Sequence, residues 1–234
     1  MQEEKKKSWA ALLVEAVTSP GAAFKEIAER PGFWPAGITL TIINLAIAWL
    51  TLPKAQEYAQ LTLEKLTDTM SAEQAEILAK TMGPQSVTVT TMVSALIMPW
   101  ITWLVVALIL KIFAAVTDKE APFRKMFAVG VYSYVPALIG GLVGSILVMN
   151  TAAENMLKAS PTLAVFSPAE SGFLFSFLSA CNPFTWWSLV LCGIGAAAVM
   201  KVKRPNGVLI CLFIVWLAFA LLTGAAGTLN TAGL

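Results

Sequence analysis

Five long stretches of apolar residues, separated by charged segments, constrain this chain more than any other feature. The hydrocarbon core of a bilayer is about 30 Å thick, and about 20 consecutive apolar helical residues cross it. Inside that core each backbone N–H and C=O must be paired within its own segment, so each stretch is expected to be an α-helix. The stretches lie near residues 33–53, 90–112, 126–149, 184–200 and 207–228. The sequence therefore predicts an all-α, polytopic membrane protein with five transmembrane helices.

The composition agrees with a membrane protein that has little mass outside the bilayer. Hydrophobic residues make up 57% of the 234 residues, charged residues only 13%, and the mean hydropathy is +0.73. These values lie outside the range of soluble domains. We expect one five-helix transmembrane domain over residues 33–234, preceded by a short cytoplasmic segment at residues 1–32.

The positive charges alternate from one side of the predicted spans to the other. Lysine and arginine concentrate in the cytoplasmic loops of membrane proteins. Twelve of the 16 basic residues fall on one predicted side: Lys5, Lys6, Lys7, Lys25, Arg30, Lys111, Lys119, Arg124, Lys125, Lys201, Lys203 and Arg204. Four fall on the other: Lys54, Lys65, Lys80 and Lys158. This bias predicts a cytoplasmic N-terminus and an external C-terminus.

Two short amphipathic helices are predicted within residues 1–32. Apolar residues between Trp9 and Val17 recur at helical spacing directly after a run of lysines, a pattern typical of a helix in the membrane interface. Ser19 and Pro20 suit the start of a second helix, whose residues Phe24, Ile27 and Ala28 share one face. These helices could pack under the bundle as a structural foot or present a surface to a partner.

Residues 54–86 form a charged excursion on the predicted outer side. Ser71 and Gln74 have the spacing of a capping box, and Gly83-Pro84 is expected to end the helix that Ser71 starts. We expect a helical hairpin, part of which extends the first two spans.

The segment 167–183 predicts a short half-helix before the fourth span. Ser167 and Pro168 resemble a helix start, the following residues are apolar on every face, and Asn182-Pro183 is expected to break the helix. About eleven apolar residues are too few to cross a bilayer. This half-helix could be re-entrant, or it could lie in the outer leaflet with Trp186 and Trp187 as interfacial anchors.

The third span combines a proline with a face of small residues. Pro136 is expected to kink this span, as Pro99 is expected to kink the second. Gly140, Gly141 and Gly144 allow another helix to approach closely. We expect that partner within the same chain, with homodimerisation as the alternative.

The side chains needed for most catalytic and metal sites are absent from the sequence. There is no histidine, and Cys181, Cys192 and Cys211 lie in apolar surroundings without paired spacing. We therefore expect no catalytic residues, no metal, no cofactor and no enzyme activity. No Asp, Glu, Lys or Arg lies in the middle of a span, which disfavours ion-coupled transport. If the membrane holds a polar site, we expect it at Asn44, Tyr132, Tyr134 and Asn182.

Three stretches together resemble the Yip1 family of five-span membrane proteins in its prokaryotic form. They are residues 18–24 with 29–31, residues 122–129 leading to Tyr132 and 134–136, and residues 182–187 continuing to Gly195. The resemblance implies a cytoplasmic N-terminus and five spans. Eukaryotic relatives associate with prenylated Rab GTPases and carry a longer N-terminal region, so we expect no Rab-type role here. For prokaryotic members the resemblance implies no established activity.

These observations favour a non-enzymatic scaffold or adaptor in a prokaryotic cytoplasmic membrane. Its cytoplasmic face is expected to contact anionic lipids or a protein partner through Phe24, Phe123, Arg124, Lys125, Lys203 and Arg204. The protein could also form homo-oligomers, and we expect no nucleic-acid partner. The alternative is a permease, channel or lipid-translocating protein whose path runs near the Asn182-Pro183 break.

Overall fold

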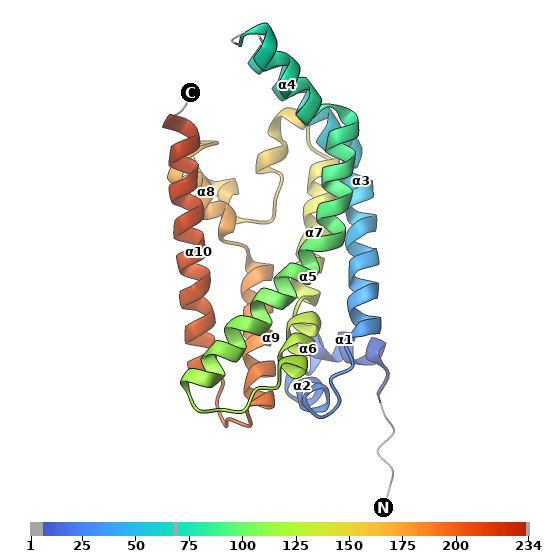
Figure 1. Cartoon of the computed structure of the whole chain (residues 1–234), viewed down its shortest axis with the longest axis vertical. Helices are drawn as coiled ribbons and strands as arrows, with labels where there is room; N and C mark the ends of the chain where they lie inside the picture. The colour runs from blue at the N-terminus through green and yellow to red at the C-terminus, as the bar shows by residue number, and fades with distance from the viewer. Residues whose placement is uncertain (1–6, 68–69, 233–234) are drawn as a thin grey trace, which may run out of the picture. The chain divides into compact units, whose positions relative to one another are not determined.

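A computed structural model describes residues 7–67 and 70–232, and their regular structure is entirely helical (Figure 1). The α-helices are α1 Trp9–Thr18, α2 Pro20–Glu29, α3 Trp34–Thr67, α4 Ala72–Met82, α5 Pro84–Val116, α6 Phe123–Ser133, α7 Val135–Met149, α8 Gly172–Ala180, α9 Pro183–Val199 and α10 Asn206–Ala232. Two 3-10 helices, η1 at Ala153–Lys158 and η2 at Leu163–Phe166, lie between α7 and α8.

The helices are long and apolar enough for a polytopic membrane protein, as predicted. Among the described residues, four segments could each cross a bilayer: α3, α5, α6 with α7, and α10. The fourth predicted span, α9, has only 17 residues. It reaches the length of a span only when counted together with α8, from which it is separated by Cys181 and Asn182.

The chain divides into two compact units. Unit 1 contains the residues up to Leu40, Pro99–Ile139 and Pro183–Leu222, and unit 2 contains Thr41–Met98, Gly140–Asn182 and the residues from Thr223. The division of the sequence into residues 1–32 and 33–234 stays a prediction.

In unit 1 the two N-terminal helices pack against α6 and α9 (Figure 1). The Ser8 hydroxyl caps α1 by accepting from the Ala11 N–H at 3.1 Å. The apolar face of α2 is buried, as its spacing predicted, with Phe24 and Ile27 fully covered. A Cβ atom on Gly195 of α9 would lie 2.7 Å from both Phe24 and Val129, so the missing side chain lets the three helices meet. The N-terminal helices thus form part of a protein core.

Aromatic rings fill a second part of unit 1. Phe33 lies with its ring centroid 4.8 Å from that of Phe127, and Trp100 lies 5.0 Å from Trp103. Trp103 is buried, and the backbone of Gly130 approaches it so closely that a Cβ there would be 3.3 Å from the Trp103 carbonyl oxygen. The Phe33 contact joins the residue before α3 to α6, and the Gly130 contact joins α6 to α5.

In unit 2, hydrogen bonds join α3 to α5. The Asn44 amide donates to the Ala95 carbonyl at 2.8 Å, and Gln56 donates to the Thr88 hydroxyl at 2.9 Å. Both helices run beyond the predicted spans, so the first two spans do extend into the charged excursion. The capping box at Ser71 and Gln74 is present and starts α4, whose C-cap is Gly83.

The small face of the third span packs within the chain, as predicted. A Cβ on Gly144 would lie 3.3 Å from Pro161, and one on Gly141 would lie 3.9 Å from Ile47. A similar face on α10 escaped the sequence analysis: a Cβ on Gly224 would lie 2.8 Å from the Phe173 ring of α8.

The predicted start of the half-helix is wrong by several residues. Instead of capping a helix at Pro168, the Ser167 hydroxyl donates to the Ala169 carbonyl at 2.8 Å. Glu170 pairs with Lys158, with 2.6 Å between Nζ and Oε1. The helix begins at Gly172, whose φ of 86° is a left-handed value that glycine adopts without strain. The break after this helix falls at Cys181 and Asn182, next to the predicted proline.

The third span is interrupted at Tyr134, two residues before Pro136. Pro136 has no N–H to donate to the carbonyl four residues earlier, which weakens the helix at this point. By contrast, Pro53 and Pro99 lie inside the continuous helices α3 and α5.

Candidate functional site

The basic residues are sorted between the two units in the same way as in the topology prediction. Every described lysine and arginine of the predicted cytoplasmic side belongs to unit 1, and Lys54, Lys65, Lys80 and Lys158 belong to unit 2. Lys5 and Lys6 lie outside the described residues. The membrane orientation itself stays a prediction.

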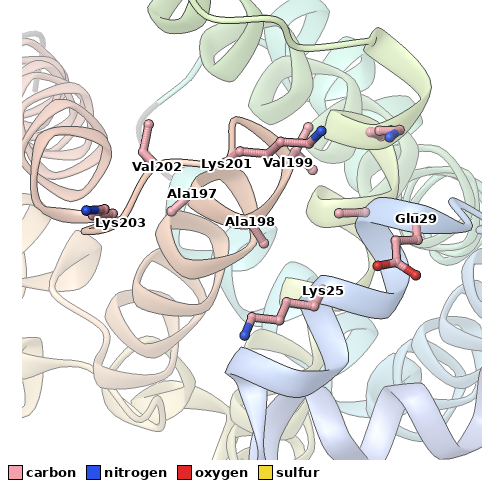
Figure 2. Close-up of a pocket in the computed structure, with 10 residues that line it drawn as sticks. Lys25, Glu29, Ala197, Ala198, Val199, Lys201, Val202 and Lys203 are labelled. Atoms are coloured by element: carbon pink, nitrogen blue, oxygen red, sulfur yellow. The ribbon is translucent and has the colours of Figure 1, made fainter.

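Unit 1 contains an open cavity of about 560 Å³, which we call the lysine pocket (Figure 2). Its lining comes from α2, α6, the end of α9 and the loop after α9: Lys25, Ala28, Glu29, Lys125, Ala197, Ala198, Val199, Lys201, Val202 and Lys203. Four lysines and one glutamate therefore surround a floor of small apolar side chains.

Helix α2 supplies Lys25 and Glu29 because its opposite face is fixed in the core. Phe24 and Ala28 are buried, so the residues beside them on the helix are held at the edge of the cavity. Lys25 and Glu29 are one helical turn apart, and Figure 2 shows both on the helix that faces the end of α9. Both side chains are exposed.

Lys201 lies two residues after the end of α9 and has a left-handed backbone conformation, with a φ of 53°. Its N–H donates to the Ala198 carbonyl at 3.3 Å, and the Val202 N–H donates to the Ala197 carbonyl at 3.0 Å. These two bonds form a Schellman motif, in which the left-handed residue is usually glycine. A lysine there costs about 1 kcal/mol of backbone strain. The helix therefore ends abruptly and brings Lys201 and Lys203 to the cavity.

Helix α6 contributes Lys125 to the same cavity. Met126 beside it is fully buried, which anchors this turn of the helix, and Lys125 itself is half-buried. The preceding residue, Arg124, is exposed and does not line the pocket. Two neighbouring cations on one helix thus differ in whether they face the cavity.

The four pocket lysines have no ion-pair partner within 4.0 Å among the described residues. A second cavity of unit 1, of about 190 Å³, differs in this respect. Its Lys7 ammonium lies 2.6 Å from the Glu15 carboxylate, and the Lys7 backbone N–H donates to Glu26 at 3.1 Å. The lysine pocket is therefore lined by four lysines that have no ion-pair partner among the described residues, with Glu29 as the acidic residue of its lining.

A smaller hollow of about 140 Å³ adjoins the lysine pocket. Val202 lines both cavities, so the two adjoin at this residue. The walls of this hollow are mainly apolar, with two cations: Phe113, Thr117, Lys119, Met200, Val202, Arg204, Gly207 and Val208. The hollow lies between the C-terminal end of α5, the N-terminal end of α10 and the loop after α9.

The structure distributes the predicted contact residues over several environments. Lys125 and Lys203 line the lysine pocket, and Arg204 lines the adjoining hollow. Phe123 is 37% exposed and remains at the surface. Phe24 is the exception: its side chain is 0% exposed, because it packs against Gly195 and Val129, so it cannot serve as a contact residue on the surface.

The predicted intramembrane polar residues belong to different units. Tyr132 and Tyr134 lie in unit 1, and Asn44 and Asn182 lie in unit 2. Tyr132 donates to the Gly32 carbonyl at 2.9 Å, and Asn44 bonds to α5 as described above. Both of these side chains therefore have hydrogen-bond partners inside their own unit: Asn44 bonds to another helix, and Tyr132 bonds to the link between α2 and α3.

Three charged residues of the pocket, Lys25, Glu29 and Lys201, were not among the predicted contact residues. The interval between Lys25 and Glu29 on an amphipathic helix did indicate that they share a face. Lys201 gave no such signal, because only the fold shows that a lysine occupies the left-handed position of the helix end.

Comparisons with known proteins identify the chain at the level of its family. The Yip1 domain model matches residues 14–226. The chain is 30% identical over 218 residues to the membrane protein YknW of Bacillus subtilis (strain 168). The aligned residues cover 91% of this chain and 89% of YknW. No solved structure matches the chain significantly.

Proposed function

The chain belongs to the Yip1 family of membrane proteins, and on this premise we propose that it is a non-enzymatic scaffold or adaptor. It would act in a prokaryotic cytoplasmic membrane, where its cytoplasmic face would hold a protein partner or the anionic membrane surface. The lysine pocket is the main support for this proposal. Its four lysines lie on the side that the charge distribution predicts to be cytoplasmic.

Two exposed aromatic residues make the partner side of this proposal testable. Phe123, at the start of α6, is 37% exposed, and Trp9, at the start of α1, is 38% exposed. Aromatic residues at a surface commonly anchor protein contacts. Photo-crosslinking amino acids at these positions in native membranes, followed by mass spectrometry, should capture a recurring protein. A matched probe at Ile146, 63% exposed on the apolar helix α7, should capture lipid instead.

The outcome separates the two candidate roles. A protein recovered from Phe123 and Trp9 but not from Ile146 supports the adaptor. If all three probes recover only lipid or the protein itself, the adaptor proposal fails. Flux measurements in proteoliposomes would then test the second role, a permease, channel or lipid-translocating protein.

A further inference from the structure

We propose that the lysine pocket and its adjoining hollow form a binding site for one molecule of an acidic phospholipid. The headgroup phosphate would lie among Lys25, Lys125, Lys201 and Lys203, and an acyl chain would lie against the hollow. This inference deepens the proposed function by naming a ligand for the same face. It differs from a general attraction to the membrane surface because it predicts that each protein chain binds one lipid molecule at one site.

The charge arrangement selects an anion. Four lysines from three separate segments line one cavity, and their ammonium groups have no carboxylate partner within 4.0 Å in the described part of the chain. Holding like charges together is unfavourable, and a bound anion relieves this repulsion. Lysines are also favoured near a helix C-terminus, such as that of α9. That explanation covers Lys201 and Lys203 but not Lys25 and Lys125.

Glu29 narrows the choice of headgroup. It is the one acidic residue of the lining, and it disfavours a bare phosphate beside it. A carboxylate accepts hydrogen bonds from hydroxyl groups. A phosphodiester headgroup that carries free hydroxyls, such as glycerol, therefore satisfies both the lysines and Glu29. Phosphatidylglycerol is the probe that matches this chemistry.

The shape of the two cavities favours a lipid over a soluble phosphate. The lysine pocket, at about 560 Å³, has the size of an ordinary small-molecule site. The adjoining hollow is lined by Phe113 and Val208, which belong to α5 and α10, two helices able to cross a bilayer. A ligand that fills both cavities therefore meets four lysines at one end and mainly apolar walls, together with Lys119 and Arg204, at the other.

Native mass spectrometry of the purified full chain in detergent tests the proposal. With phosphatidylglycerol the protein should retain one bound lipid, and with phosphatidylcholine at equal concentration it should retain at least fivefold less. Lys125→Gln and Lys201→Asn should each reduce phosphatidylglycerol binding at least threefold. Asparagine is chosen at position 201 because it tolerates the left-handed backbone. Arg124→Gln is the matched control, since it removes one charge from the next residue but leaves the pocket intact.

Each result supports or overturns the site. Equal losses in Lys125→Gln and Arg124→Gln would show general surface charge and refute it, as would equal retention of both lipids. If millimolar glycerol 1-phosphate or inorganic phosphate displaces the lipid, the acyl chains contribute nothing to binding. The ligand would then be a soluble phosphate, and the lipid proposal would fail. Thermal unfolding followed by circular dichroism verifies that each variant is folded, if its melting temperature equals that of the wild type. Loss of lipid in Lys125→Gln with unchanged protein crosslinks would show that the two proposals stand or fall separately.

Discussion

The Tyr132 hydroxyl donates a hydrogen bond to the Gly32 carbonyl, with 2.9 Å between the two oxygens, and so ties α6 to the link between α2 and α3. The Tyr132→Phe variant removes this bond while preserving the ring. We expect a loss of about 1 kcal/mol in the free energy of unfolding, measured by thermal melting in detergent. Tyr134→Phe serves as the control, because its ring packs against Trp103 without a comparable bond. Equal melting of Tyr132→Phe and wild type would contradict this role.

Gly195 controls the packing of three helices. In Gly195→Ala the added methyl group would lie 2.7 Å from Phe24 and Val129, both in a closed core. Overpacking of this kind costs about 1–3 kcal/mol, so the melting temperature should fall by several degrees. Gly21→Ala is a suitable comparison, since nothing lies within 4 Å of its added Cβ and alanine favours the helix. A stable Gly195→Ala protein would mean that α2 can move away from α9.

The Lys158–Glu170 ion pair, which lies on the predicted outer side, should make stability depend on pH. The hydrogen bond from Lys158 and, secondly, the positive charge of Lys158 hold the pKa of the Glu170 carboxyl below its ordinary value of 4.5. Because the folded pKa is lowered, the pair's contribution to stability is present above pH 4.5 and is lost as the pH falls through the lower, folded pKa. Carbon-13 NMR of this carboxyl should give a midpoint below 4.5, and Lys158→Gln should raise it. An unshifted midpoint would show that the exposed pair does not persist in solution.

The predicted orientation can be measured by labelling single cysteines. In a variant without Cys181, Cys192 and Cys211, we expect Lys80→Cys to react with a membrane-impermeant maleimide added to intact cells. Lys203→Cys should react only after the membrane is permeabilised. Both positions are exposed in the structure, so burial does not explain a difference between them. The reverse pattern would place the N-terminus and the lysine pocket outside.

Much of the helical framework could be predicted because its signals are local. The apolar stretches locate α3, α5 and α10, and the capping box at Ser71 locates the start of α4. The start of α8 could not be predicted from Ser167 and Pro168. Those residues have the composition of a helix start, but the Ser167 hydroxyl and Glu170 bind elsewhere in the fold.

The lysine pocket shows why a site is harder to predict than a helix. Its residues come from separate parts of the chain, and spacing on one helix cannot indicate which helix packs against it. For the same reason, the spacing of Phe24 and Ile27 identified a shared face but not the α9 surface that covers it. Lys125 and Arg124 likewise cannot be distinguished by sequence, because both are basic and adjacent.

The length of α3 has a consequence for how the protein is made. Its 34 residues extend about 51 Å along the helix axis, well beyond the roughly 30 Å of hydrocarbon. In the predicted orientation, with the N-terminus inside, the charged turns after Lys54 and α4 cross the membrane during synthesis. In that orientation, the turns of α3 that extend beyond the hydrocarbon meet water on the outer side of the membrane.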